Sequence, residues 1–70
     1  MDDDEIFRRL MADATGKLED AATLAADGQA KGVHAQTRLQ MTRDIQDIVR
    51  DAMALTRAAR CVIEANPSDN

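Results

Sequence analysis

The side chains best suited to chemistry in this 70-residue chain are an acidic run near the start, three regularly spaced arginines, one histidine and one cysteine. A catalytic nucleophile needs a base and an orienting group within reach. His34 is the single histidine, and neither it nor Cys61 has neighbours in sequence that could complete such a group. We therefore expect no enzymatic activity and no catalytic residues.

A metal site would need three or four converging ligands, and a cofactor site would need a recognisable binding motif. The sequence contains no such motif, and an antiparallel helical hairpin would place His34 and Cys61 at opposite ends of the molecule. We expect no metal, no cofactor and no small-molecule ligand. Cys61 cannot form an internal disulfide, although on oxidation it could cross-link two chains.

The three arginines Arg43, Arg50 and Arg57 recur every seven residues, which places them on one face of a helix. Such a face could bind phosphates or an acidic partner, because arginine makes paired hydrogen bonds to these groups. The alternative is a solvated face, in which Asp47 pairs within the helix with Arg43 or Arg50. We regard the three arginines as a possible polar contact face.

The overall charge argues against a general affinity for nucleic acid. The net charge is −4 and Phe7 is the only aromatic residue, so few groups are present to neutralise phosphates or stack on bases. A cluster of arginines is expected at the end of the hairpin where the first helix begins and the second helix ends. Acidic residues are expected at the same end. The members of the arginine cluster are Arg8, Arg9, Arg57 and Arg60. Nucleic acid is therefore an unlikely partner, and the longest apolar runs are too short to span a membrane.

The stretch from residue 41 to 62 organises the chain, because its apolar residues are spaced alternately by four and three and no proline or glycine interrupts it. These residues are Met41, Ile45, Ile48, Ala52, Leu55, Ala59 and Val62. This heptad spacing keeps one seam of a helix facing a partner helix. A first helix shows the same pattern at Phe7, Met11, Ala14, Leu18, Ala21, Ala25 and Gly28.

The pattern predicts an all-α fold consisting of a single antiparallel helical hairpin. We expect helix 1 over about 3–31, a turn over about 32–37, helix 2 over about 38–65 and a polar tail over 66–70. Asp2 and Glu5 have capping-box spacing for the first helix, as Thr37 and Gln40 have for the second. Gly32 is the preferred cap of helix 1, with a break at Gly28 as the alternative.

Folding the hairpin near residue 35 brings together seam positions whose numbers sum to 69 or 70. Six of the seven resulting layers set a small residue against a large one, as in the pairing of Leu18 with Ala52. That alternation fills a helical core without voids. The sequence thus predicts a specific register as well as a hairpin.

Apolar residues beside the two seams predict self-association. One neighbouring helix cannot cover Leu10, Leu24, Val49, Met53 and Ile63. A second hairpin packed about a two-fold axis would cover them and give a four-helix bundle, which resembles in architecture the ROP-type helical hairpin dimer. We expect a homodimer with these five residues at the dimer or partner interface.

These observations favour a small cytoplasmic protein-interaction module, such as an adaptor, a regulator or a helical chaperone. A cytoplasmic location is expected because the chain begins with acidic residues and carries a single cysteine. The surplus apolar surface supports an interaction role, and the negative charge allows a basic protein partner. The alternative is an RNA- or DNA-binding regulator that uses the arginine-bearing helix faces.

Overall fold

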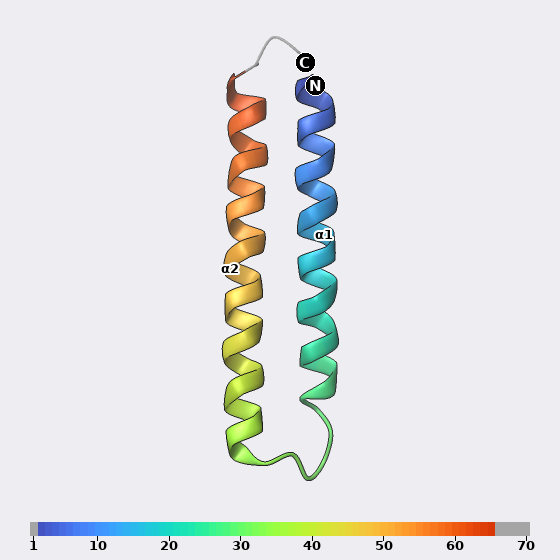
Figure 1. The fold of residues 1–70 in the computed structure, drawn as a ribbon, viewed down its shortest axis with the longest axis vertical. Helices are drawn as coiled ribbons and strands as arrows, with labels where there is room; N and C mark the ends of the chain where they lie inside the picture. The colour runs from blue at the N-terminus through green and yellow to red at the C-terminus, as the bar shows by residue number, and fades with distance from the viewer. Residues whose placement is uncertain (1, 66–70) are drawn as a thin grey trace.

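The protein is an antiparallel hairpin of two long helices. The computed structural model describes residues 2–65, in which α1 spans Asp3–Asp27 and α2 spans Ala35–Ala65 (Figure 1). The molecule measures 54 × 18 × 13 Å, so it is a rod one layer thick. Neither of the two described helices is apolar enough over a sufficient length to cross a membrane.

The start of α1 is fixed by its own acidic residues. The Glu5 backbone N–H donates to Asp2 Oδ1 at 2.8 Å, which satisfies one of the N–H groups that a helix leaves unpaired in its first turn. Three more acidic residues occupy that turn, where negative charge is favourable against the helix dipole. The predicted role of Asp2 as the N-cap is confirmed.

The end of α1 comes earlier than expected, at Asp27 rather than near residue 31. The Gly28 N–H still bonds to the Leu24 carbonyl at 2.9 Å, but the next two bonds reach back only three residues, as in a tighter 3₁₀ turn. The alternative break at Gly28 is therefore where the helix stops. Gly32 does take the left-handed conformation, with φ of 81°, but it does so inside the loop rather than as a helix cap.

The start of α2 also differs from the prediction, because the helix begins at Ala35 instead of near residue 38. The His34 carbonyl accepts the first helical bond, from the Arg38 N–H at 2.9 Å. The predicted capping box of Thr37 and Gln40 cannot form inside a helix, and the Gln40 side chain instead donates to Asp44 at 2.8 Å. At the other end, the predicted tail over 66–70 lies outside the described residues.

The predicted seam of α2 is confirmed. All seven members, from Met41 to Val62, are buried or half-buried, and Ala52 and Ala59 are the most enclosed. Because the whole seam stays covered over this length, α2 must supercoil with its partner to keep the seven-residue repeat in register.

The predicted seam of α1 is wrong at alternate positions. Met11 and Leu18 are exposed, at 42% and 51% of their surface, and Ala25 is exposed too. Apart from Ile6, which is also half-buried, the buried or half-buried positions are instead Phe7, Leu10, Ala14, Lys17, Ala21, Leu24 and Gly28. The α1 seam therefore runs with spacings of three and four, not four and three.

The antiparallel direction of α2 explains this correction. Read backwards from Val62, the α2 seam advances by three and then four residues, and α1 must advance by the same steps to stay in layer with it. Seam positions then face one another wherever their numbers sum to 69. Two observations fit this register: Lys17 Nζ lies 3.5 Å from Asp51 Oδ2, and Leu24 lines the same hollow as Ile45.

The core of the hairpin consists of small residues. In the described part of the chain the buried residues are Ala14, Ala21, Ala52 and Ala59, and the two on each helix are separated by one heptad. Ala14 faces Leu55 and Ala59 faces Leu10 in the register above, so alanines allow the larger side chains to lie beside the opposite backbone. The larger side chains remain only half-buried between two helices. The hairpin thus gains limited hydrophobic stabilisation by itself.

Two glycine substitutions should shift stability in opposite directions. Gly16 lies within α1 with open space where a Cβ would stand, so Gly16→Ala should raise the free energy of unfolding by about 0.5–1 kcal/mol. Gly32→Ala should lower it by about 1 kcal/mol, because φ of 81° is strained for alanine. Urea unfolding followed by circular dichroism measures both, and equal shifts of the two variants would contradict the loop conformation.

Enlarging a buried alanine should cost stability. Ala52 is only 4% exposed, so Ala52→Leu should lower the free energy of unfolding by about 1–3 kcal/mol through overpacking. Ala54→Leu, two residues away on the exposed side of α2, is the matched control and should change it by less than about 0.5 kcal/mol. Thermal unfolding at one protein concentration compares the two, and an unaffected Ala52→Leu variant would refute the seam.

Candidate functional site

The exposed large hydrophobic residues gather on one side of the hairpin. In the part of the chain that the structure describes, these residues are Met11, Leu18, Leu39, Val49, Met53 and Ile63. We call them the apolar face. Each side chain is exposed over 38% to 51% of its surface. A set of this size on one side of a small rod is typical of an interaction surface.

A shallow hollow between the helices shows that residues from α1 and α2 share this side. Its lining includes Ala25 from α1 and Thr42 from α2. Leu18 precedes Ala25 by one heptad, and Val49 and Ile63 follow Thr42 by one and three heptads. Because the supercoil keeps heptad-related residues in line, both rows run along the same side of the hairpin.

The predicted interface residues divide between two environments. Val49, Met53 and Ile63 are exposed on the apolar face, as expected for residues that a single hairpin cannot cover. Leu10 and Leu24 are instead half-buried in the seam of α1. Their place at the surface is taken by residues that the sequence analysis assigned to the seam, Met11 and Leu18.

Leu39 was missed because it precedes the predicted helix 2 seam. It lies two heptads before Met53, so it belongs to the same row once α2 begins at Ala35. The spacing of fourteen residues between Leu39 and Met53 is the signal in the sequence that indicates this position. Because the turn was expected over residues 32–37, Leu39 was expected at the very start of helix 2, where a residue need not belong to a packed row.

The opposite side of the hairpin is acidic. Its aspartates flank the seam on the side away from the apolar face, and they are Asp13, Asp20, Asp27, Asp44 and Asp51. Asp13 and Asp20 line a second hollow together with Lys17 and Leu55. The Lys17–Asp51 ion pair crosses between the helices on this acidic face. The hairpin therefore presents two chemically different sides.

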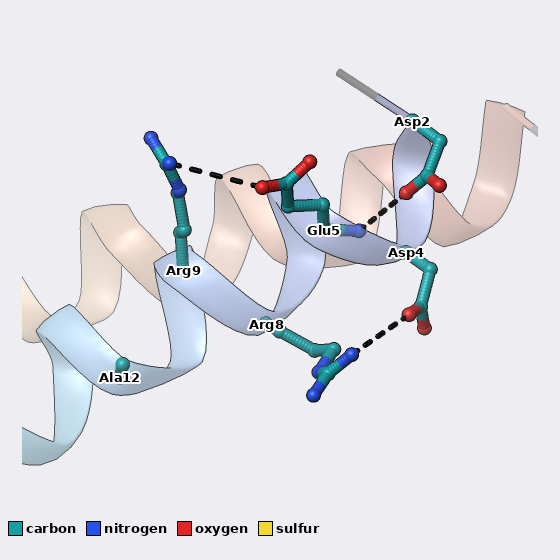
Figure 2. Close-up of a pocket in the computed structure, with 6 residues that line it drawn as sticks. All are labelled: Asp2, Asp4, Glu5, Arg8, Arg9 and Ala12. Atoms are coloured by element: carbon teal, nitrogen blue, oxygen red, sulfur yellow. Dashed lines mark hydrogen bonds and ion pairs between the residues drawn. The ribbon is translucent and has the colours of Figure 1, made fainter.

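The start of α1 carries a cluster of paired charges. Figure 2 shows the Arg8 guanidinium directed to Asp4 and that of Arg9 directed to Glu5, with separations of 3.4 and 3.8 Å. Both pairs join residues four apart on the same helix and are well exposed. Such pairs contribute little to stability and leave each arginine already neighboured by a carboxylate. Two of the four arginines of the basic cluster expected at this end are thus paired with carboxylates of their own helix.

The arginine row predicted as a polar contact face lies along α2. Arg43, Arg50 and Arg57 are all exposed, and Arg50 Nη1 lies 3.1 Å from Asp47 Oδ1 in an ordinary pair within the helix. Arg60, on another row, pairs with Glu64 at 3.5 Å. The row is therefore interrupted by acidic neighbours rather than continuous in positive charge.

The two candidate ligand residues are far apart. His34 lies in the loop, whereas Cys61 is exposed near the end of α2, at the opposite end of the hairpin (Figure 1). Among the described residues, no group of three or more histidine, cysteine, aspartate or glutamate side chains is arranged to hold a metal ion.

No protein-family model, curated protein or solved structure matches the chain.

Nucleic-acid binding through the arginine row can be tested directly. Because the net charge is −4 and Arg50 is already paired with Asp47, we expect no retardation of duplex DNA or of an RNA hairpin at about 50 mM salt, where phosphate contacts are strong. Gel retardation across salt concentrations measures this. Salt-sensitive retardation that is lost when Arg43, Arg50 and Arg57 are all replaced by glutamine would contradict the prediction.

Proposed function

We propose that this chain is a small protein-interaction module that acts as a helical-bundle homodimer, with the apolar face as its association surface. The observation that carries the proposal is the gathering of the exposed large hydrophobic side chains on one side of the hairpin. Packing two apolar faces together would give a four-helix bundle.

The hydrophobic gain available from association is large for a molecule of this size. Five members of the apolar face, Met11, Leu18, Val49, Met53 and Ile63, are each covered over roughly half of their surface. Covering the remainder would contribute about 4–8 kcal/mol, taking about 1.5–3 kcal/mol for a fully buried side chain of this kind. This is comparable with the whole stability of an ordinary small domain.

The surface area of the hairpin supports the same proposal. The chain exposes 5451 Å², whereas a compact monomer of 7.7 kDa would expose about 4300 Å². A standard interface buries about 800 Å² on each partner. Covering one side of the rod with a second hairpin would therefore bring the exposed surface per chain close to that of a compact protein.

The acidic face suggests why association would stop at two copies. A second hairpin covers one side of the rod, and the aspartates on the other side would then point outward from the bundle. Further stacking would bring aspartates of neighbouring bundles together, which is unfavourable. The outer surface would remain available to another protein, which suits an adaptor, a regulator or a helical chaperone with a basic partner.

A cytoplasmic location is part of this proposal. Cys61 is exposed and is the single cysteine of the chain, so an internal disulfide cannot contribute to stability. Association through the apolar face would supply the stabilisation that small disulfide-rich domains obtain from cross-links.

Charging the apolar face should separate the two copies. Val49→Lys combined with Met53→Lys places two ammonium groups in the proposed interface, so this variant should sediment as a monomer at micromolar concentration and lose helicity. The unmodified protein should sediment as a dimer, with a melting temperature that rises with protein concentration. Analytical ultracentrifugation and circular dichroism provide these measurements.

The matched control is Ala54→Lys combined with Ala58→Lys, which has the same spacing on α2 but lies outside the apolar face. This control should remain dimeric and fully helical. If the unmodified protein is instead a stable monomer whose melting temperature does not depend on concentration, the homodimer is wrong.

A further inference from the structure

The apolar face contains a hollow at one end and a protruding side chain at the other. The hollow, which we call the loop-end groove, lies next to the connection between α1 and α2. Its lining consists of Leu24, Ala25, Gly28, Gln29, Arg38, Met41, Thr42 and Ile45. Most of these residues are apolar, and the polar side chains of the set belong to Gln29, Arg38 and Thr42.

Gly28 helps to keep the loop-end groove open. A Cβ placed on Gly28 would have only the Leu24 and Ala25 carbonyl oxygens within 4 Å, at 3.4 and 3.5 Å, so no other side chain fills this space. An apolar side chain from another molecule could therefore contact Leu24, Met41 and Ile45 across the groove, where it would bury surface that the hairpin leaves half-covered.

Ile63 is suited to fill such a groove. It is 50% exposed near the end of α2 and lies three heptads after Thr42, in the same row along the apolar face. Within one chain it cannot reach the groove, because the two lie at opposite ends of a rod 54 Å long. A second copy running in the opposite direction would bring the two together.

The positions of Ile63 and the groove satisfy two-fold symmetry about Met53. Ile63 lies ten residues beyond Met53, and position 43, ten residues before Met53, falls within the span of 38–45 that the α2 residues of the groove cover. At 1.5 Å per residue both are about 15 Å from Met53. A two-fold axis through that point would superimpose each Ile63 on the level of the other copy's groove.

Resting on the proposed homodimer, we infer that the two hairpins pack with their loops at opposite ends and that Ile63 of each copy occupies the loop-end groove of the other. The interface is then isologous, with the same contact made twice. The same axis brings Leu18 and Val49 of one copy close to the level of Met11 in the other, so large residues of the apolar face lie opposite one another.

The competing arrangement has both loops at the same end, with the two-fold axis parallel to the helices. It would place Ile63 at the same level as its own counterpart, at the end away from the loops, and leave the two loop-end grooves facing each other with no Ile63 side chain between them. The first arrangement fills both grooves, and this difference favours it.

Single-cysteine variants distinguish the two arrangements. In a Cys61→Ser background, one protein carries Ala25→Cys in the groove and a second carries Ile63→Cys. The two are mixed, unfolded and refolded together so that dimers exchange, and then oxidised mildly. We expect a disulfide-linked dimer from the mixture and none from either protein alone, as seen by electrophoresis without reductant.

The matched control uses Asp27→Cys and Ala65→Cys, each two residues after the test position on the acidic side of its helix, and these should not cross-link when mixed. Circular dichroism and sedimentation of every variant before oxidation establish that it is folded and dimeric. Cross-linking of Ile63→Cys with itself, or a dimer that forms no disulfide in the mixture, would overturn this arrangement while leaving the homodimer intact. A monomeric parent protein would overturn the homodimer as well, and would assign the apolar face to a partner of different sequence.

Discussion

The packing of four alanines between α1 and α2 is the constraint on which the rest of the structure depends. Because Ala14, Ala21, Ala52 and Ala59 are the buried residues, the larger seam residues that face them, Leu10, Lys17, Ile48 and Leu55, each pack against an alanine. Two helices in contact along one narrow seam cannot enclose a leucine or an isoleucine completely. The large side chains therefore remain partly exposed, and the alanine seam determines on which side of the hairpin they lie.

The seam of α2 was predictable from the sequence, whereas that of α1 was predictable only in part. In α2 a single row of apolar residues fits the heptad. In α1, Leu10 stands beside Met11 and Leu24 beside Ala25, so both rows fit at these two levels, whereas at the level between them hydrophobicity favours Leu18 over Lys17 and so selects the wrong row. The choice between them depends on the reversed spacing of the partner helix. This places Lys17 in the seam opposite Ala52, a position that hydrophobicity alone would never assign to lysine, and its aliphatic stem can cover the alanine while its ammonium reaches Asp51.

Local sequence signals predicted the start of α1 correctly but not its end, because only the start depends on nearby residues alone. The Asp2 cap depends on residues within one turn, and it forms as expected. The loop contains two glycines, Gly28 and Gly32, and either could follow the end of the helix. The residues around them do not indicate which of the two does so. The later residue, Gly32, adopts the left-handed conformation expected of a cap, but α1 has already ended before Gly28.

The candidate site follows from this corrected seam. Val49, Met53 and Ile63 could be predicted because the α2 seam was right, but Met11 and Leu18 reach the surface only when Leu10 and Leu24 take the seam. That exchange also separates the chemistry of the two sides: it moves apolar residues to one flank and leaves aspartates on the other. A hairpin with two apolar flanks would stack without limit, whereas one with an apolar and an acidic flank favours a closed pair. The one-residue shift of the α1 seam thus determines which large side chains remain exposed and on which side of the hairpin they lie.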